Sequence, residues 1–189
     1  MLILASKSPR RREILNKLPL KYQVISSNVN EKKFSEKNPA ELSKSLAIAK
    51  AIEVSSKTKD YVLAADTVVS FDGNILGKPS SLEQCRMVLQ MLSANKHYVI
   101  TGVALCFEGT VIDAFYETTS VYFKPLSNQI IEWYISTEEP FDKAGGYGIQ
   151  GKGGVFVERI EGCFYNVMGL PLSRTSELLT HHGIMKWGN

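Results

Sequence analysis

The sequence predicts a protein of the α/β class, in which strands and helices alternate along one chain. Three stretches carry this prediction. Residues 2–5 form an apolar run of strand length and lead directly into the start of a helix. Residues 61–71 form a nearly continuous apolar run, which is typical of a strand buried on both faces. Residues 97–107 and 110–123 predict a long β-hairpin around a Glu-Gly turn.

The first helix begins with an unusual cluster of positive charge. Ser8 is a suitable N-cap, and Pro9 then occupies the first helical position, where its missing N–H costs nothing. Arg10, Arg11 and Arg12 therefore fall in the first turn, although the helix dipole favours acidic residues there. A serine turn, free backbone N–H groups and arginine side chains together predict a phosphate site. The alternative is a basic turn that faces only water.

The next elements supply two further candidates. Residues 22–26 predict a short strand, and the polar loop after it contains Glu31, which by itself is weak evidence for a site. A helix then begins at Asn38, with Pro39 at its first position. Lys50 lies on an apolar stripe of this helix. Its ammonium group either extends past that stripe to solvent or reaches into a cleft.

The apolar strand at residues 61–71 is interrupted by Asp66 and Thr67. A carboxylate in such a strand must find a partner, become protonated or bind a cation. Asp66 therefore either caps a nearby loop or belongs to a site. A hairpin turn is expected at residues 72–74. Lys78 follows in a loop, where it is either solvated or returns towards Asp66.

The second half of the chain continues the alternation of elements. In chain order, we expect a helix at 81–92, the hairpin already described, a helix at 127–136, a strand at 155–160, a turn at 163–171 that contains Asn166 and Gly169, and a helix at 172–182. His97 has no second histidine or cysteine nearby in the sequence, so a structural role is at least as well supported as a chemical one.

Six glycines fall between residues 145 and 154. Glycine serves where the backbone takes positive φ or approaches a ligand closely, and the alternative is a flexible surface loop. Gln150 lies within this stretch. Its amide offers a donor beside an acceptor, which matches the O4 and N3–H edge of uracil or thymine. We therefore regard Gln150 as a candidate base-reading residue.

The composition limits the class of protein. A chain of 189 residues with 44% hydrophobic and 22% charged residues is ordinary for one globular domain, here residues 1–189, which can consist of two small lobes that share a cleft. The net charge of +3 does not indicate a nucleic-acid coat or a membrane binder. Three cysteines without metal-like spacing, no signal-peptide pattern and no membrane-length apolar run predict a cytoplasmic protein.

Cations beside carboxylates, with a glycine-rich loop, describe nucleotide chemistry. The chain has no GxxxxGK[ST] P-loop, and no GxGxxG follows a strand. Several motifs instead resemble those of the Maf family of nucleoside triphosphate pyrophosphatases, in the family's order and over nearly the whole chain. They are Ser6-Lys7-Ser8-Pro9-Arg10-Arg11, Ala65-Asp66-Thr67-Val68-Val69, Gly77-Lys78-Pro79, Thr101-Gly102-Val103, Asp142-Lys143-Ala144-Gly145-Gly146-Tyr147-Gly148-Ile149-Gln150-Gly151 and Asn166-Val167-Met168-Gly169-Leu170-Pro171.

The glycine-rich motif resembles the subgroup that acts on dTTP and UTP. The resemblance implies a mixed, elongated sheet flanked by helices, with two lobes around a central cleft, as in the Maf and ITPase-like fold. It also implies hydrolysis between the α- and β-phosphates to a nucleoside monophosphate and pyrophosphate. A homodimer is plausible on the same grounds. A stable nucleic-acid complex and a membrane association are not expected.

The resemblance also assigns roles to residues. Asp66 matches the catalytic proton acceptor. The substrate-binding positions that the family implies are Ser6, Arg10, Arg11, Lys50, Thr67, Lys78 and Gln150, and among these Arg11, Thr67 and Gln150 match positions of substrate selection. Joined to the residue pattern, this predicts that Glu31 and Asp66 hold Mg²⁺ or Mn²⁺ against the triphosphate oxygens.

Two departures from the family pattern and two alternative functions complete the analysis. The family often has an acidic pair where this chain has Asn30 and Glu31, so one carboxylate on the metal side is absent here. Its usual Ser-Gly before the hairpin is Ser93-Ala94, which should alter only a turn. The alternatives are a purine-selective house-cleaning pyrophosphatase and a nucleotide- or RNA-binding module without turnover.

Overall fold

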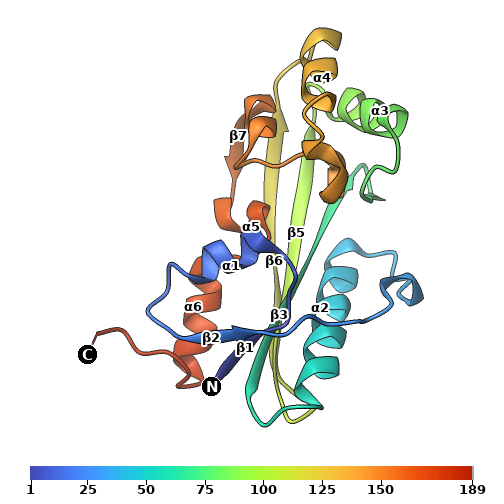
Figure 1. The fold of residues 1–189 in the computed structure, drawn as a ribbon. Helices are drawn as coiled ribbons and strands as arrows, with labels where there is room; N and C mark the ends of the chain where they lie inside the picture. The colour runs from blue at the N-terminus through green and yellow to red at the C-terminus, as the bar shows by residue number, and fades with distance from the viewer. Residues whose placement is uncertain (189) are drawn as a thin grey trace.

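The structure is a computed structural model that describes residues 1–188. In this part of the chain, one mixed sheet of seven strands is flanked by helices (Figure 1). The strand order is β2-β1-β3-β5-β6-β7, and β4 also pairs with β3. The strands are β1 (Leu2–Leu4), β2 (Tyr22–Val24), β3 (Tyr61–Phe71), β4 (Asn74–Leu76), β5 (Lys96–Phe107), β6 (Thr110–Phe123) and β7 (Val157–Glu161).

Only β1 makes parallel pairs, with β2 and β3, whereas β3, β5, β6 and β7 are joined by antiparallel pairs. The α-helices are α1 (Pro9–Leu15), α2 (Pro39–Ser55), α3 (Leu82–Leu92), α4 (Asn128–Ile135), α5 (Phe164–Met168) and α6 (Leu172–His181). Four short 3₁₀ helices are η1 (Glu31–Lys33), η2 (Glu139–Asp142), η3 (Ala144–Gly146) and η4 (Lys152–Phe156). This is the mixed α/β fold that the sequence predicts.

The sheet continues through two lobes (Figure 1). In the lower lobe, α2 packs on one face of the sheet around Ala47 and Ala51, and α1 and α6 pack on the other around Ile14 and Leu179. In the upper lobe, a separate apolar cluster includes residues of α3, α4 and η4. The long strands β3, β5 and β6 pass from one lobe into the other and connect their cores.

Helix α2 approaches the sheet unusually closely at Gly102 on β5. A Cβ atom at Gly102 would lie 2.3 Å from the backbone carbonyl of Ser43, a distance that no side chain tolerates. Glycine at this position therefore lets the α2 backbone rest directly on the strand. This contact sets the height of α2 above β3, and hence the position of Lys50.

The predicted helix starts are confirmed by their caps. The side chain of Ser8 accepts from the backbone of Arg11, and Asn38 accepts from two N–H groups at the start of α2. Ser81 caps α3 in the same way. Gln84 does not complete a capping box with Ser81, because its side chain instead bonds to Ser80.

Two predicted elements differ from the structure. The strand predicted over residues 155–160 begins only at Val157, because Lys152–Phe156 form η4. The segment predicted as a turn around Asn166 contains α5, which ends at Gly169 with φ of 114°. A helix of five residues is too short to show helical periodicity, whereas its terminal glycine is visible in the sequence.

Candidate active site

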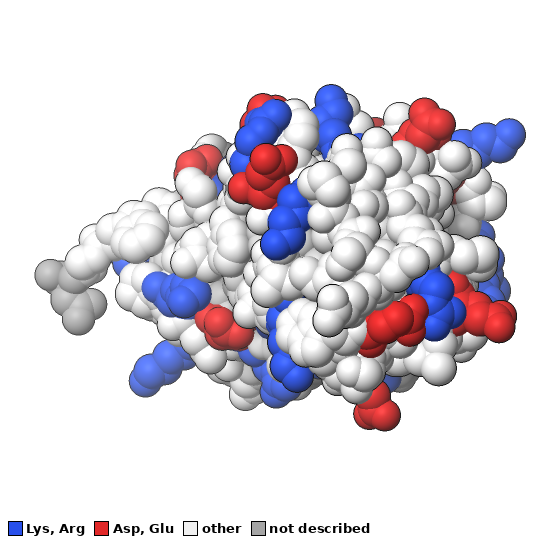
Figure 2. All heavy atoms as spheres, turned by 90° about the horizontal axis from the view of Figure 1, so that it is seen from above, with Lys and Arg blue, Asp and Glu red and all other residues white. Residues whose placement is uncertain are grey.

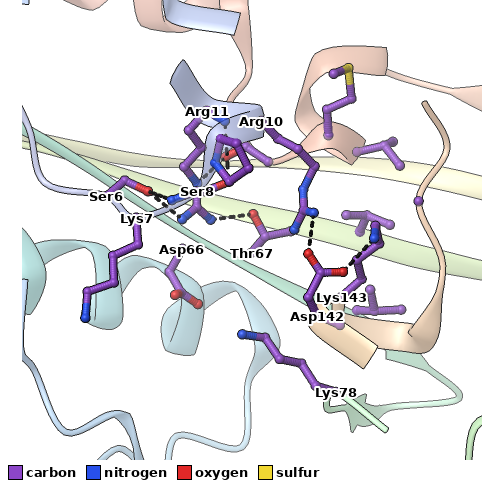
Figure 3. Close-up of a pocket in the computed structure, with 18 of the residues that line it drawn as sticks. Ser6, Lys7, Ser8, Arg10, Arg11, Asp66, Thr67, Lys78, Asp142 and Lys143 are labelled. Carbon is purple, nitrogen blue, oxygen red and sulfur yellow. Dashed lines mark hydrogen bonds and ion pairs between the residues drawn. The ribbon is translucent and has the colours of Figure 1, made fainter. Parts of the chain in front are cut away.

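A cavity of about 450 Å³ lies between the two lobes, and both lobes line it (Figure 3). The β1–α1 turn, α2 and β3 contribute from the lower lobe, and the segment from η2 to Gln150 contributes from the upper lobe. The structure brings all of the predicted site residues to this one cavity. They are Ser6, Arg10, Arg11, Glu31, Lys50, Asp66, Thr67, Lys78 and Gln150.

The arginine side chains in the first turn of α1 do not all face the same way: Arg11 faces the cleft and Arg12 faces solvent. The Arg11 guanidinium points into the cavity, where Nε donates to the carbonyl of Gly169 at 2.8 Å and Nη2 to Oγ1 of Thr67 at 3.1 Å (Figure 3). Burial lowers the pKa of Arg11, and the charge of Asp66 opposes that shift. Arg12 is exposed, so for this residue the water-facing interpretation is correct.

Three charged side chains converge at the next part of the cavity. The Lys50 ammonium lies 2.5 Å from Oδ1 of Asp66 and 2.6 Å from Oε1 of Glu31. The side chains of Lys50 and Asp66 are only 13% and 12% exposed, so this pair is poorly screened by water. Burial would raise the pKa of Glu31, but the hydrogen bond from Lys50 and the charges of Lys50, Lys78 and Arg11 together lower it.

Lys50 therefore reaches into the cleft and does not extend to solvent. It is also the cation that pairs with Asp66, whereas Lys78, for which a solvated position and a return towards Asp66 were both open, is exposed. Lys78 also lines this cavity, and its ammonium group points into it (Figure 3). Lys50 pairs with Asp66 because α2, which carries Lys50, stacks directly over β3, which carries Asp66.

A third carboxylate on the cavity, that of Asp142, pairs with two cations. Asp142 accepts from Nη1 of Arg10 at 3.0 Å and from the Lys143 ammonium at 2.5 Å (Figure 3). Burial would raise the pKa of Asp142, but the hydrogen bonds from Lys143 and Arg10 lower it. Arg10 is thus neutralised in this structure, and an anionic ligand would compete with Asp142 for it.

The glycine-rich segment is held by one carboxylate that the sequence did not single out. Glu139 accepts from the hydroxyl of Tyr134 at 3.1 Å, from the backbone N–H of Lys152 at 2.9 Å and from that of Gly153 at 3.3 Å. A Cβ on Gly151 would lie 2.5 Å from the same carboxylate. The glycine therefore allows the backbone to close around Glu139, and the segment is ordered by these bonds.

Tyr147 anchors the same segment to the core of the upper lobe. Its hydroxyl lies 2.7 Å from Nε2 of His97, and both side chains pack against Phe123. His97 is fully buried, and burial lowers its pKa to about 4. The structural role considered for His97 is therefore the one that the structure supports. Gln150 is exposed and lines the cavity beyond this anchor.

Sequence reasoning missed several residues that line the cavity or shape it. They are Lys7, Ser27, Glu139, Asp142 and Lys143. For Asp142 and Lys143 a signal existed, since both begin the glycine-rich stretch. For Glu139 there was none, because two of its three partners are backbone N–H groups 13 and 14 residues away.

Glu31 and Asp66 are the residues that could hold a divalent metal, because their carboxylates meet at the Lys50 ammonium. Within residues 1–188, no group of three or more histidine, cysteine, aspartate or glutamate side chains could hold a metal ion. Asn30 takes no part in the cavity, because its side chain caps η1. Two carboxylate oxygens completed by substrate phosphates nevertheless form an ordinary Mg²⁺ donor set.

The fold and the cleft together define an α/β protein with a binding site for a polyanion. Cations from both lobes and three carboxylates, those of Glu31, Asp66 and Asp142, line one cavity, and clustered cations are the arrangement expected for phosphate groups. The chain belongs to the Maf family, because its residues 1–182 match the family model described as Maf-like protein.

Curated relatives share nearly the full length of the chain. A dTTP/UTP pyrophosphatase of Thermosipho africanus is 49% identical over 97% of this chain and 94% of its own. A dTTP/UTP pyrophosphatase of Pyrococcus furiosus is 50% identical over 90% of each chain. Among solved structures, a HAM1 protein from Coxiella burnetii matches with a TM-score of 0.50 at 16% identity, covering 95% of this chain and 98% of that one. This last likeness shows the shared fold alone.

Proposed function

We propose that the protein is a nucleoside triphosphate pyrophosphatase that hydrolyses dTTP and UTP to the nucleoside monophosphate and diphosphate. The observation that carries the proposal is the meeting of Asp66, Lys50 and Glu31 on a cavity whose other charged lining residues are mainly cations. Relatives with the same motifs over nearly the same length are named for this activity.

Asp66 acts as the proton acceptor. A water oxygen attacks the α-phosphorus, the bond to the oxygen that bridges to the β-phosphorus breaks, and the proton of the water passes to the Asp66 carboxylate. The Lys50 ammonium, 2.5 Å away, holds the Asp66 carboxylate in place at the cavity. Charge that develops on the departing diphosphate is stabilised by the arginine and lysine side chains Arg10, Arg11, Lys50 and Lys78.

A divalent ion, Mg²⁺ or Mn²⁺, would be held by Glu31 and Asp66 together with phosphate oxygens. Bound there, the ion would neutralise part of the negative charge of the phosphates. The two carboxylates converge within hydrogen-bond distance of one ammonium group, so both lie close enough to contribute to one site.

Gln150 carries the preference for pyrimidines in this proposal. It is exposed on the cavity and belongs to the segment that Glu139 and Tyr147 anchor. A side-chain amide pairs with the O4 and N3–H edge of uracil or thymine, and one good bidentate contact of this kind discriminates by about 1–3 kcal/mol.

Pyrophosphate release from a panel of nucleoside triphosphates, with Mg²⁺, with Mn²⁺ and with EDTA, tests the proposal. We expect metal-dependent release from dTTP and UTP and little from ATP or GTP, with Asp66→Asn as the inactive control. Release from purines alone would favour the purine-selective alternative. Tight binding with no release from any nucleotide would favour the binding module.

We also propose a cytoplasmic homodimer without a stable nucleic-acid complex. The three free cysteines support a reducing compartment. On the face of the molecule seen from above, basic and acidic side chains lie interspersed (Figure 2). Within residues 1–188, no helix is long and apolar enough to cross a membrane. Light scattering after size exclusion measures the oligomeric state.

A further inference from the structure

A chain of hydroxyl groups runs from the cavity into the buried core. Nη2 of Arg11 lies 3.1 Å from Oγ1 of Thr67, which lies 2.9 Å from Oγ1 of Thr101. Oγ1 of Thr101 lies 3.0 Å from the backbone carbonyl of Asn166. Thr101 and Asn166 are fully buried, whereas Thr67 lines the cavity (Figure 3 shows its bond to Arg11).

The groups at the two ends of this hydroxyl chain, Arg11 and the Asn166 carbonyl, fix the direction of every hydrogen bond in it. A guanidinium can only donate, so Thr67 accepts from Arg11. A carbonyl can only accept, so Thr101 donates to Asn166. The single remaining hydrogen, that of Thr67, then completes the chain by pointing at Thr101. The opposite orientation would leave the oxygens of Thr101 and Asn166 3.0 Å apart with no hydrogen between them, in a place without solvent.

Asn166, at the buried end of the hydroxyl chain, is held in place by several hydrogen bonds. The side-chain amide of Asn166 donates to the carbonyl of Val99 and to the hydroxyl of Thr119, both at 2.9 Å. Thr119 in turn exchanges hydrogen bonds of 3.0 Å with the backbone of Cys163. The carbonyl that Thr101 requires is therefore positioned by three separate segments of the fold.

We propose that Thr101 is a positioning residue that makes Thr67 a pure hydrogen-bond acceptor towards the cavity. The hydrogen of Thr67 is committed to Thr101, so only a lone pair remains for a ligand. Resting on the function proposed above, the site then favours nucleotides that present a hydrogen-bond donor to Thr67. That donor is either the imide N3–H of the pyrimidine, in which case Gln150 contacts O4 alone, or the 3′-hydroxyl of the sugar.

Both sources fit the substrates of the proposed function. Uracil and thymine carry a hydrogen on N3, whereas cytosine presents a lone pair at the same position. The 3′-hydroxyl is common to dTTP and UTP, and O-methylation turns it into an acceptor alone. A substrate that presents an acceptor would place its lone pair against that of Thr67 with no hydrogen between them, so the substrate's own acceptor would lack a partner there.

Thr101→Val, compared with Thr101→Ser, tests the inference. Valine keeps the shape of threonine but frees the Thr67 hydrogen to turn into the cavity, whereas serine keeps the hydroxyl. Rates of pyrophosphate release from UTP, CTP and 3′-O-methyl-UTP are measured for wild type and both variants. In Thr101→Val, we expect the kcat/KM of one acceptor substrate relative to UTP to rise by about tenfold, while Thr101→Ser keeps the wild-type ratio.

The substrate whose kcat/KM relative to UTP rises identifies the group that donates to Thr67. A gain on CTP assigns the contact to N3, and a gain on 3′-O-methyl-UTP assigns it to the sugar. Adding Thr67→Val to Thr101→Val should abolish the gain, because no hydroxyl then remains to donate. Thermal melts check that each variant is folded. The carbonyl of Asn166 still accepts from the backbone of Gly169, so Thr101→Val should fold.

Unchanged ratios in folded Thr101→Val, or equal changes in Thr101→Ser, would overturn the inference and leave the proposed function intact. If the wild-type protein releases pyrophosphate from no nucleotide, the proposed function fails instead. The direction of the hydroxyl chain can then be read from the exchange and chemical shift of the Thr67 and Thr101 hydroxyl protons by NMR. A Thr67 proton that exchanges with solvent as fast as a free hydroxyl would overturn the inference in that case as well.

Discussion

The two sides of the cleft are built in different ways. One side, the strand wall, consists of Ser6, Arg11, Asp66 and Thr67, which stand on the β1–α1 turn, the first turn of α1 and β3. The other side, the loop wall, consists of residues 139–154, which contain η2, η3 and the start of η4 and include six glycines. Sheet hydrogen bonds position the strand wall, whereas a few side chains position the loop wall. A single substitution should therefore disturb geometry more in the loop wall and chemistry more in the strand wall.

The largest effect is expected in the strand wall. Asp66→Asn removes the proton acceptor but keeps the shape of the side chain, so kcat should fall by about 10²–10⁴-fold. Thermal unfolding should remain cooperative, because the backbone pairing of β3 is untouched. Asp72→Asn, in the exposed β3–β4 turn, is the matched control and should retain its rate. Full activity in Asp66→Asn would remove Asp66 from the mechanism.

The next effect concerns the anchor of the loop wall and depends on pH. His97 has a pKa of about 4 when folded and near 6.5 when unfolded, so the unfolded chain binds more protons between these values. Stability from this residue is present above pH 6.5 and is lost as pH falls towards 4. Between pH 7 and 4.5 the loss should be about 2–3 kcal/mol.

Urea unfolding of wild type and His97→Gln at the two pH values measures this loss. His97→Gln should be less stable at pH 7 but should lose less on acidification. His181→Gln, at an exposed position, should follow the wild-type pH dependence. Equal pH dependence in His97→Gln and wild type would show that His97 does not titrate in this range.

A smaller effect is expected where Glu139 holds the loop wall. In wild type, both carboxylate oxygens of Glu139 accept from backbone N–H groups. In Glu139→Gln an NH₂ group replaces one of these oxygens, so one backbone N–H group loses its acceptor. The KM for UTP should rise by about tenfold, with a smaller change in kcat, since Asp66 is not touched. Glu138→Gln, at an exposed neighbour, is the control. If both variants behave alike, the loop wall does not depend on this carboxylate.

The smallest effect lies at a turn in the upper lobe, away from both walls. Ala94 has φ of +57°, a conformation that glycine adopts without steric cost. Ala94→Gly should raise the free energy of unfolding by about 0.5–1 kcal/mol, measured by urea unfolding, with no change in activity. Ala40→Gly, in the first turn of α2, should lower it instead. A decrease in both variants would contradict the strain assigned to Ala94.

The same contrast explains what the sequence could predict. Caps, apolar runs and the hairpin turn are local signals, and they place the strand wall and Lys50 correctly. The motif resemblance added roles for the predicted site residues, but it did not single out lining residues such as Lys7, Asp142 and Lys143. The pairing of Lys50 with Asp66 depends on how closely α2 rests on Gly102, and the role of Glu139 depends on backbone groups more than ten residues away. Both are contacts of the folded chain that no window of sequence contains.

The long strands have a mechanical consequence. Because β3, β5 and β6 continue through both lobes, no flexible loop separates the lobes at the level of the sheet. The mouth of the cavity can then widen only by elastic twisting of paired strands or by movement of the loop wall. Twisting a sheet strains many hydrogen bonds at once, whereas moving the loop wall strains few. Entry of a nucleotide and departure of its products should therefore be governed by the compliance of residues 139–154.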